Sequence, residues 1–334
     1  MSNVLEAQDL HVHFPVRDGA FTFGRARTVR AVDGVSCDIR AGEVLALVGE
    51  SGSGKTTIGK ALVGLIPLTS GRISYRGRDL NSLRGAELRA LRRRMQLIYQ
   101  DPYESLDSRQ TVFQTVAEPL LVHRMAKNER EMRERVFAAL EAAGLHPPAE
   151  VSQRYPHHLS GGERQRVVIA AAMVCEPDLV VADEPVSMLD VSVRAEILRL
   201  MLDLRKSREL TYVFITHDLS LAWVIADRIA VMYLGRIVEI GPTEEVIRRP
   251  HHPYTKSLVT VIPAPVAPPS QRKIILAGET PSPANIPSGC RFHTRCWLWQ
   301  RLLRPDRCRA DDPSLRPVAE DHSAACHFAE EVES

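Results

Sequence analysis

Short apolar runs and alternating segments divide the first 240 residues into predicted strands and helices. Loose alternation of apolar and polar residues predicts three strands, at Val4–Phe14, Val35–Ile39 and Arg72–Tyr75. Continuous apolar runs are typical of strands buried on both faces, and they occur at Glu43–Val48, Leu179–Ala182 and Tyr212–Thr216. Helical patterns precede or follow each run, the first at Lys55–Leu65. Strands that alternate with helices indicate an α/β fold with a mostly parallel sheet.

The pattern changes twice along the chain. Residues 101–160 contain helical patterns, clearest at Asn128–Leu145, and predict a helical insertion within the α/β domain. After about Pro242 the periodicity fades, and Val261–Lys273 reads as a proline-rich linker. We therefore predict one domain over residues 1–245, an extension and linker over 246–285, and a small cysteine-rich module over 286–328.

Composition adds two limits. The chain has 334 residues and a formal net charge of +2, which does not suggest a nucleic-acid partner. The N-terminal residues lack the basic and apolar regions of a signal peptide, and no apolar run approaches the ~20 residues that span a bilayer. We expect a cytosolic protein, in which thiols stay reduced and a cluster of cysteines suggests metal rather than disulfides.

The segment GESGSGKTT, Gly49–Thr57, fits the phosphate-loop pattern G-x-x-x-x-G-K-[ST], and it follows a predicted buried strand and opens a helix. Its glycines allow backbone N–H groups to point at phosphate oxygens, and the helix N-terminus favours negative charge. The predicted nucleotide-binding residues are Gly49, Ser51, Gly52, Ser53, Gly54, Lys55, Thr56 and Thr57. Lys55 would supply charge to the β- and γ-phosphates, and Thr56 would ligate Mg²⁺.

Two carboxylates end the apolar run LVVADEP. If this strand ends beside the phosphate loop, Asp183 lies near Mg²⁺ and Glu184 can orient and polarise an attacking water. A solvated turn is the alternative for an isolated Asp-Glu pair, but the upstream phosphate loop favours the functional interpretation.

The segment LSGGERQR predicts a second anion site. Ser160, Gly161 and Gly162 precede a periodic apolar run, as at a helix N-terminus that can bind an anion. An ordinary helix cap with a flexible turn is the alternative. One phosphate loop already provides a complete phosphate-binding site, so a second anion site in the same chain needs a separate explanation.

Five segments resemble, in order and spacing, the motifs of ABC-transporter ATPase subunits over about residues 4–245. They are GESGSGKTT, LSGGERQR, LVVADEP, SMLD and FITHD. The resemblance implies a phosphate-loop ATPase core with a mostly parallel sheet, an antiparallel β subdomain and a helical insertion. It also implies a head-to-tail dimer, in which Ser160, Gly161 and Gly162 grip the γ-phosphate of an ATP bound by a second ATPase subunit, identical or related.

The same resemblance assigns further roles residue by residue. Gln100 matches the residue that senses Mg²⁺ and the attacking water, His217 the switch histidine, and Asp190 the acidic residue of the loop at the dimer interface. Phe14 is the candidate for stacking on adenine. The chain departs from the usual pattern with Glu163 in place of glutamine and Met188 in place of alanine, but neither change removes a group that touches phosphate.

The sequence from Met232 to Leu258, and the tail that follows, resemble the C-terminal extension of dipeptide and oligopeptide permease ATPases. This implies ATP-driven peptide import at the cytoplasmic face of the membrane, with two membrane-spanning permease subunits and, indirectly, an extracytoplasmic substrate-binding protein. Importers of nickel and of some glycosides share the extension, so they remain alternatives. A soluble ABC ATPase acting in DNA repair or translation is the competing class.

Four cysteines lie in the tail, with 5, 11 and 17 residues between successive members: Cys290, Cys296, Cys308 and Cys326. A proline-rich tail low in aliphatic residues is expected to bury little apolar surface and to need a staple. Four thiolates suit Zn²⁺ or an iron–sulfur cluster, but no C-x2-C pair typical of zinc occurs. The resemblance implies a [4Fe–4S] cluster, and His293, His322 and His327 are alternative ligands. A redox or iron sensor is a further possible role.

Overall fold

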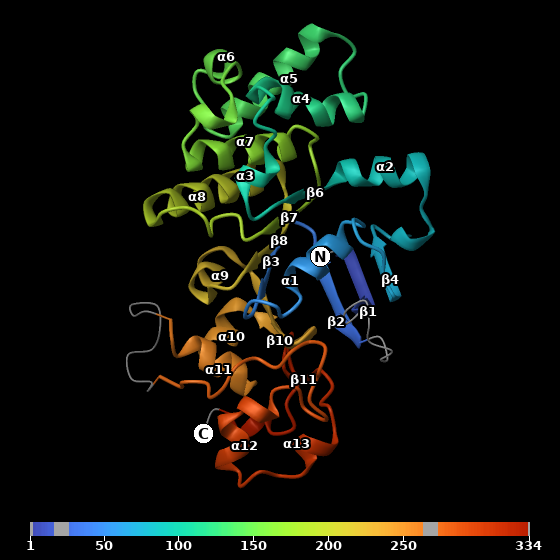
Figure 1. Cartoon of the computed structure of the whole chain (residues 1–334), viewed down its shortest axis with the longest axis vertical. Helices are drawn as coiled ribbons and strands as arrows, with labels where there is room; N and C mark the ends of the chain where they lie inside the picture. Colours follow the sequence, from blue (N-terminus) through green and yellow to red (C-terminus); the bar gives the residue numbers. More distant parts are fainter. Residues whose placement is uncertain (1–2, 17–26, 263–272, 333–334) are drawn as a thin grey trace, which may run out of the picture. The chain divides into compact units, whose positions relative to one another are not determined.

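The structure is a computed structural model that describes residues 3–16, 27–262 and 273–332. The predicted proline-rich linker, Val261–Lys273, falls largely outside these ranges. The chain divides into two compact units, each built from segments far apart in sequence (Figure 1). One holds residues 78–215 with two short N-terminal segments, and the other holds most of residues 5–77 and all of 216–334.

The first unit is a three-stranded parallel sheet with a group of helices. Strand β6 (Met95–Ile98) pairs with β7 (Leu179–Asp183), which pairs with β8 (Thr211–Thr216). All residues of β7 and β8 are buried, as their continuous apolar runs predict. In register, Ile98 faces Ala182 and Asp183 faces Ile215, so the carboxyl ends of the three strands meet at one edge.

Residues 101–160 of this unit contain helices and, among these described residues, no strand. Helix α5 begins after Asn128, whose side chain accepts a hydrogen bond from the Glu131 N–H, and ends three residues earlier than predicted. The reason is Gly144, whose φ of +73° places it in the left-handed region typical of a helix end. The helices of the unit are α2 (Gly85–Arg94), α3 (Pro102–Ser105), α4 (Val112–Val122), α5 (Glu129–Ala142), α6 (Pro148–Val151), α7 (Gly161–Met173) and α8 (Val191–Arg208).

The second unit contains two sheets. In one, β1 (Asn3–Val16) lies between β2 (Arg27–Arg40) and β4 (Ser70–Tyr75), and β1 pairs with β4 antiparallel. In the other, β3 (Val44–Val48) pairs parallel with β9 (Arg228–Tyr233), and antiparallel pairing continues the sheet through β10 (Arg236–Pro242), β12 (His322–Ala324) and β11 (Arg316–Ala319). Its helices are α1 (Lys55–Leu62), α9 (Leu219–Ile225), α10 (Thr243–Arg248), α11 (Pro253–Val259), α12 (Trp297–Arg301) and α13 (Arg307–Ala310).

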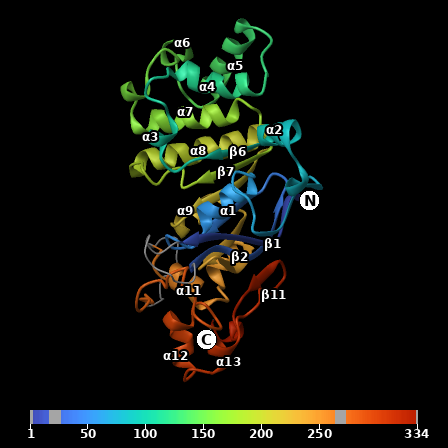
Figure 2. The ribbon, with the colours of Figure 1, turned by 45° about the vertical axis from the view of Figure 1, so that its right-hand side comes forward.

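The C-terminal tail belongs to the core of this second unit. Phe292 and Leu298 are 1% exposed, and the Phe292 ring lies 5.2 Å from that of Tyr233 and 5.4 Å from that of Tyr254, centroid to centroid. Strand β12 adds to β10, and Ala324 faces Glu239. Figure 1 shows the tail beside β10 and α11, and Figure 2 shows it beside α11. The expectation that the tail buries little apolar surface is therefore wrong, because composition did not reveal that β9 and α11 supply an apolar face for it.

Candidate nucleotide site

The phosphate loop joins β3 to α1, as predicted, and its glycines are sterically required. Gly54 has a φ of +102°, and a Cβ atom there would lie 2.1 Å from the Ala31 carbonyl oxygen. A Cβ atom on Gly49 would lie 2.3 Å from the carbonyl oxygen of Met232. Neighbouring backbone therefore packs directly against the loop, and only glycine fits at these two positions.

Inside the loop, the side chain of Lys55 is buried and folds back over the backbone. Its Nζ donates hydrogen bonds to the carbonyl oxygens of Gly49 at 2.7 Å and Glu50 at 2.9 Å. The hydroxyl of Ser53 is buried and has no hydrogen-bond partner among the described residues. Thr56, in contrast, is exposed at the first turn of α1. A buried ammonium and a buried unpaired hydroxyl suit a loop that closes around an anion.

Glu50, inside the phosphate loop, is held by the C-terminal tail. Its N–H donates to the Tyr254 hydroxyl at 2.9 Å, and its carboxylate accepts from Arg295 Nη1 at 2.8 Å and from the Thr280 hydroxyl. Arg295 itself also donates to Thr280 at 3.0 Å. The sequence analysis missed this network. No motif pairs residue 50 with residue 295, because the contact depends on how the tail folds back.

In the first unit, Gln100 and Glu184 are brought together. Gln100 follows β6 and Glu184 follows β7, and because these strands are parallel their ends adjoin. Gln100 Nε2 donates a hydrogen bond to Glu184 Oε2 at 3.3 Å. Asp183, the last residue of β7, is 3% exposed. The sheet thus gathers two predicted catalytic residues and one predicted Mg²⁺ ligand at one edge.

Glu184 has an unusual backbone. Its φ of +45° lies in the left-handed region, and its N–H donates to the Ile215 carbonyl oxygen at 3.0 Å. For a residue with a side chain, this conformation costs on the order of 1–3 kcal/mol and needs support from its surroundings. The hydrogen bonds from Gln100 and to Ile215 provide such support, and they fix the direction of the carboxylate.

Ser160 begins helix α7 as a capping residue. Its hydroxyl accepts from the Glu163 N–H at 3.3 Å, and its own N–H donates to Glu163 Oε2 at 2.8 Å. Hydrogen bonds from the Ser160 N–H and hydroxyl hold the pKa of Glu163 below its usual value. The unusual Glu163 therefore acts as the third residue of a capping box, a position where glutamate and glutamine serve equally.

Asp190 caps the next helix, α8, where its carboxylate accepts from the Val193 N–H at 3.2 Å and from the Ser192 hydroxyl at 2.8 Å. Val193 also packs on the other motif, because a Cβ atom on Gly162 would lie 2.7 Å from its Cγ1. Met188 and Val191, on either side of the loop, are 57% and 80% exposed. Ser160, Gly162 and Asp190 therefore lie on packed neighbouring helices with apolar side chains exposed beside them.

Two further predicted residues, His217 and Phe14, lie in the second unit. His217 follows β8 and precedes α9, and it is exposed. Phe14 lies near the end of β1 and is 44% exposed, as a ring available for stacking would be. The phosphate loop, His217 and Phe14 belong to the second unit, whereas Gln100, Asp183, Glu184 and the two capping motifs belong to the first.

The four tail cysteines are free thiols, and they do not show the compact arrangement of a metal site. Ligands about 2.3 Å from one zinc ion would lie within about 4 Å of one another. Over the described ranges, the only group with three His, Cys, Asp or Glu ligand atoms within 4.8 Å consists of His11, His13 and Asp33. Burial raises the pKa of the cysteine thiols, to about 11 for Cys296 and about 12 for Cys326, which favours the protonated form. The comparisons described below do not support a [4Fe–4S] cluster either.

The alternative histidine ligands have other partners. His322 is buried and its Nε2 lies 2.8 Å from Glu239 Oε1, while His293 Nδ1 lies 2.8 Å from the Cys290 carbonyl oxygen. His327 Nε2 lies 2.9 Å from the carbonyl oxygen of Asp311. These three histidines serve the packing of the tail.

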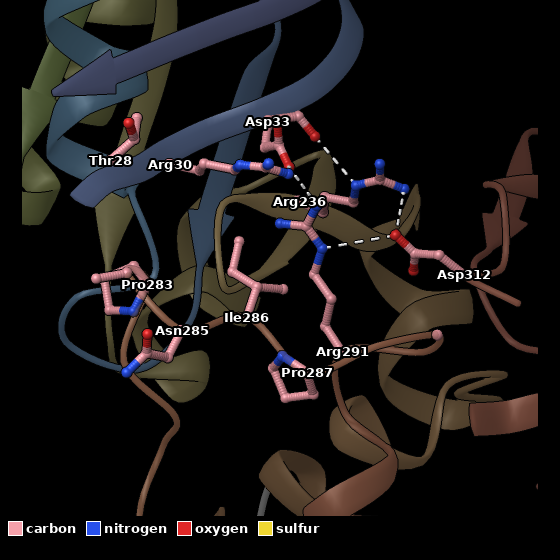
Figure 3. Close-up of a pocket in the computed structure, with 12 residues that line it drawn as sticks. Thr28, Arg30, Asp33, Arg236, Pro283, Asn285, Ile286, Pro287, Arg291 and Asp312 are labelled. Atoms are coloured by element: carbon pink, nitrogen blue, oxygen red, sulfur yellow. Dashed lines mark hydrogen bonds and ion pairs between the residues drawn. The ribbon is translucent and has the colours of Figure 1, made fainter. Parts of the chain in front are cut away.

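A cleft of about 880 Å³ lies in the second unit between the start of β2 and the tail (Figure 3). Arg291 rises from the tail to bond Asp33, and its Nε lies 3.6 Å from Asp312 Oδ2. Arg236 bonds the same Asp312 oxygen at 2.9 Å. The cleft is thus lined by arginine–aspartate pairs that tie the tail to the ATPase core.

Comparison with known proteins places these motifs in a family. Residues 32–187 match the family model described as ABC transporter, and residues 238–301 match that of the oligopeptide/dipeptide transporter, C-terminal region. A probable peptide ABC transporter ATP-binding protein of Sinorhizobium fredii is 44% identical over 97% of this chain and 89% of its own length. The di/tripeptide transport ATP-binding protein DppF of Pseudomonas aeruginosa is 43% identical over 99% of both chains.

Solved structures agree on the fold. The cbiO1 protein from Clostridium perfringens, part of the transporter complex cbiONQ, superposes with a TM-score of 0.62 at 29% identity, over 74% of this chain and 91% of that one. The ATP-binding cassette MJ0796, a dimer bound to ADP and Pi, superposes with a TM-score of 0.63 at 27% identity, over 72% and 98%. Among the described helices, none is long and apolar enough to cross a bilayer. The predicted α/β ATPase fold is confirmed, and the chain belongs to the ABC transporter ATP-binding protein family.

Proposed function

We propose that this chain is the ATP-hydrolysing subunit of an ABC importer for dipeptides or oligopeptides. The observation that carries this proposal is its similarity along almost the whole chain to relatives named as peptide transport ATP-binding proteins, with the C-terminal extension included. An ATPase core alone would indicate only ABC chemistry. The matched extension, together with the names of these relatives, favours peptides as the substrate class.

In the proposed site, ATP lies on the phosphate loop, with Lys55 on the β- and γ-phosphates and Phe14 against the adenine. Thr56, Asp183 and Gln100 would hold Mg²⁺, which neutralises charge on the phosphates when bound. Glu184 polarises the attacking water, and the hydrogen bond from Gln100 orients its carboxylate. His217 contacts the γ-phosphate. The buried Ser53 hydroxyl and the buried Lys55 ammonium support an anion at this loop.

The proposed working form is a head-to-tail dimer of two ATPase subunits, identical or related. Ser160, Gly161 and Gly162 of one subunit would meet the γ-phosphate of the other, and Asp190 would lie at the interface. Exposed Met188 and Val191 next to Asp190 support this assignment, because apolar side chains exposed together mark an interaction surface. The dimer would close on ATP binding and open after hydrolysis, and this conformational change would drive transport.

This conformational change would be transmitted to the membrane through residues 101–160, whose helices α3–α6 would contact two membrane-spanning permease subunits. The chain would therefore sit peripherally at the cytoplasmic face of the membrane, and an extracytoplasmic binding protein would deliver the peptide. Among the described residues, no contact favours nickel import, glycoside import or a soluble ABC function over peptide import.

The [4Fe–4S] cluster at Cys290, Cys296, Cys308 and Cys326 stays a hypothesis from the resemblance alone. Metal analysis of anaerobically purified protein decides it. Four iron atoms and four sulfides per chain would support the cluster, whereas iron-free protein would refute it.

The proposed function is tested by Glu184→Gln in the assembled importer. The variant should bind ATP normally, accumulate as a closed ATPase dimer and lose peptide-stimulated hydrolysis by at least about 100-fold. Glu176→Gln, an acidic residue outside the motifs, is the matched control. Unchanged turnover in the Glu184 variant would refute the assignment of the catalytic base. Copurification with ribosomes or DNA, without permease subunits, would refute the transport function.

A further inference from the structure

Three polar side chains that the proposed nucleotide site does not use converge on strands β1 and β2. His11 and His13 lie two residues apart on β1 and therefore on the same face, and Asp33 lies on the neighbouring strand β2. His11 Nδ1 lies 3.1 Å and His13 Nε2 lies 3.0 Å from the same atom, Asp33 Oδ1. Asp33 is 5% exposed, and both imidazoles are about one-fifth exposed.

These separations suit a shared metal ion. Nitrogen and oxygen ligands about 2.1 Å from one ion, at tetrahedral or octahedral angles, lie about 3.0–3.4 Å from each other. The two His–Asp separations fall in that range, and all three ligand atoms lie within 4.8 Å of one another. The partly exposed histidines leave a path for an ion to enter.

Hydrogen bonds alone do not give every ring nitrogen of this group a suitable partner when the histidines are neutral. His11 faces two carboxylates, since its Nδ1 meets Asp33 and its Nε2 lies 3.2 Å from Asp9 Oδ1. A neutral imidazole has one N–H, so one of these two contacts then places a nitrogen lone pair against a carboxylate oxygen. A cation between His11 Nδ1 and Asp33 removes this conflict, and the N–H on Nε2 then donates to Asp9.

The surrounding contacts are those of a supported metal site. A metal-bound histidine usually donates a hydrogen bond from the N–H of its second ring nitrogen to a carboxylate. Metal-bound carboxylates are themselves hydrogen-bonded. Asp9 provides the first contact, and Arg291 provides the second by bonding Asp33 Oδ2, the oxygen not shared by the histidines (Figure 3).

We propose that His11, His13 and Asp33 bind one divalent transition-metal ion, with Asp9 and Arg291 orienting the ligands. Two imidazoles and one carboxylate favour Zn²⁺, Co²⁺, Ni²⁺ or Fe²⁺ over Mg²⁺ and Ca²⁺, which prefer oxygen ligands. The site lies next to Ala31, whose backbone packs on Gly54 of the phosphate loop. A bound ion would thus stabilise the strand pair against which the loop rests.

The test is titration of the full-length, reduced chain with Co²⁺, followed by absorption and by equilibrium dialysis. The cysteine thiols are present in every variant, and thiolate-bound Co²⁺ has strong near-ultraviolet charge-transfer absorption that a histidine–carboxylate site lacks. We expect the wild type to bind one more Co²⁺ per chain than His11→Ala. The double variant His157→Ala/His158→Ala, an exposed histidine pair, controls for surface binding and should match the wild type.

A milder variant keeps the test decisive if His11→Ala does not fold. Asp9→Asn alters an exposed side chain that orients His11, and asparagine tolerates the φ of +48° found there. It should weaken Co²⁺ binding by about 10- to 100-fold, the usual effect of losing an outer carboxylate. Equal stoichiometry in wild type and His11→Ala, or equal affinity in wild type and Asp9→Asn, would overturn the proposal and leave a protonated His11 as the explanation.

Discussion

The contact between Arg295 and Glu50 makes the C-terminal tail part of the nucleotide site, and its removal has a predictable result. Arg295 comes from the stretch that carries the first two tail cysteines, and it bonds the Glu50 carboxylate with two nitrogens, at 2.8 and 3.3 Å. In Arg295→Ala the carboxylate keeps only the Thr280 hydroxyl among these side-chain partners. We expect the phosphate loop to lose stability and ATP affinity together.

The magnitude follows from the burial of the two partners. The Arg295 side chain is 9% exposed and that of Glu50 is 28% exposed. Exposed ion pairs contribute about 0–1 kcal/mol, whereas removing one partner of a fully buried pair costs about 3–5 kcal/mol. This pair lies between the two cases, so the expected loss in the free energy of unfolding is about 2 kcal/mol. If the whole of this free energy is lost from ATP binding at the phosphate loop, the ATP dissociation constant rises about 30-fold.

A double-mutant cycle measures this coupling. Arg295→Ala, Glu50→Gln and the double variant are compared by urea unfolding and by the ATP dissociation constant. Side chains in contact show coupling energies of about 0.5–3 kcal/mol, and we expect about 2 kcal/mol here. Arg309→Ala, at an exposed arginine of the same tail, is the matched control and should change neither quantity.

Three results would refute the reasoning. Additive effects of the two substitutions, within about 0.5 kcal/mol, would show that the ion pair does not couple the tail to the loop. A normal ATP dissociation constant in a destabilised Arg295→Ala would limit its role to folding. An equal effect from Arg309→Ala would mean that any loss of tail charge suffices.

Three further predictions concern the same unit. Lys55→Ala should weaken ATP binding by at least about 100-fold in a fluorescence titration, because a buried ammonium leaves the loop; unchanged affinity would contradict its role. Gly54→Ala should lower the free energy of unfolding by at least about 2 kcal/mol through its clash with backbone, against about 1 kcal/mol for Gly52→Ala, where a Cβ atom meets nothing within 4 Å. Burial lowers the pKa of His252 to about 3, so below pH 6.5 the unfolded state binds a proton that the folded state does not, and stability falls with falling pH. Between pH 6.5 and 5 the loss should be about 2 kcal/mol in urea unfolding, and His252→Asn should remove it.

Much of the ATPase core was predictable because its signals are local. The phosphate loop needs glycines where backbone crowds it, as at Gly54, and a buried parallel strand needs an unbroken apolar run, as in β7 and β8. Strands β6, β9 and β10 were not predicted. Gln96 in β6 and Glu239 in β10 interrupt the apolar patterns of these two strands, whereas β9 carries a continuous apolar run after Arg228 that the sequence analysis missed.

Motif spacing in the sequence predicts which residues carry the phosphate chemistry, because Lys55 follows the glycines of the loop and Asp183 and Glu184 stand at the end of an apolar run. The role of the tail, in contrast, depends on its tertiary contacts. Composition predicted a loose segment held by metal, yet Phe292 enters the apolar core and Arg295 reaches Glu50. Burial and ion pairing depend on the surface that a segment meets, and the partners of the tail, Tyr233 and Tyr254 for Phe292 and Glu50 for Arg295, lie outside the local sequence.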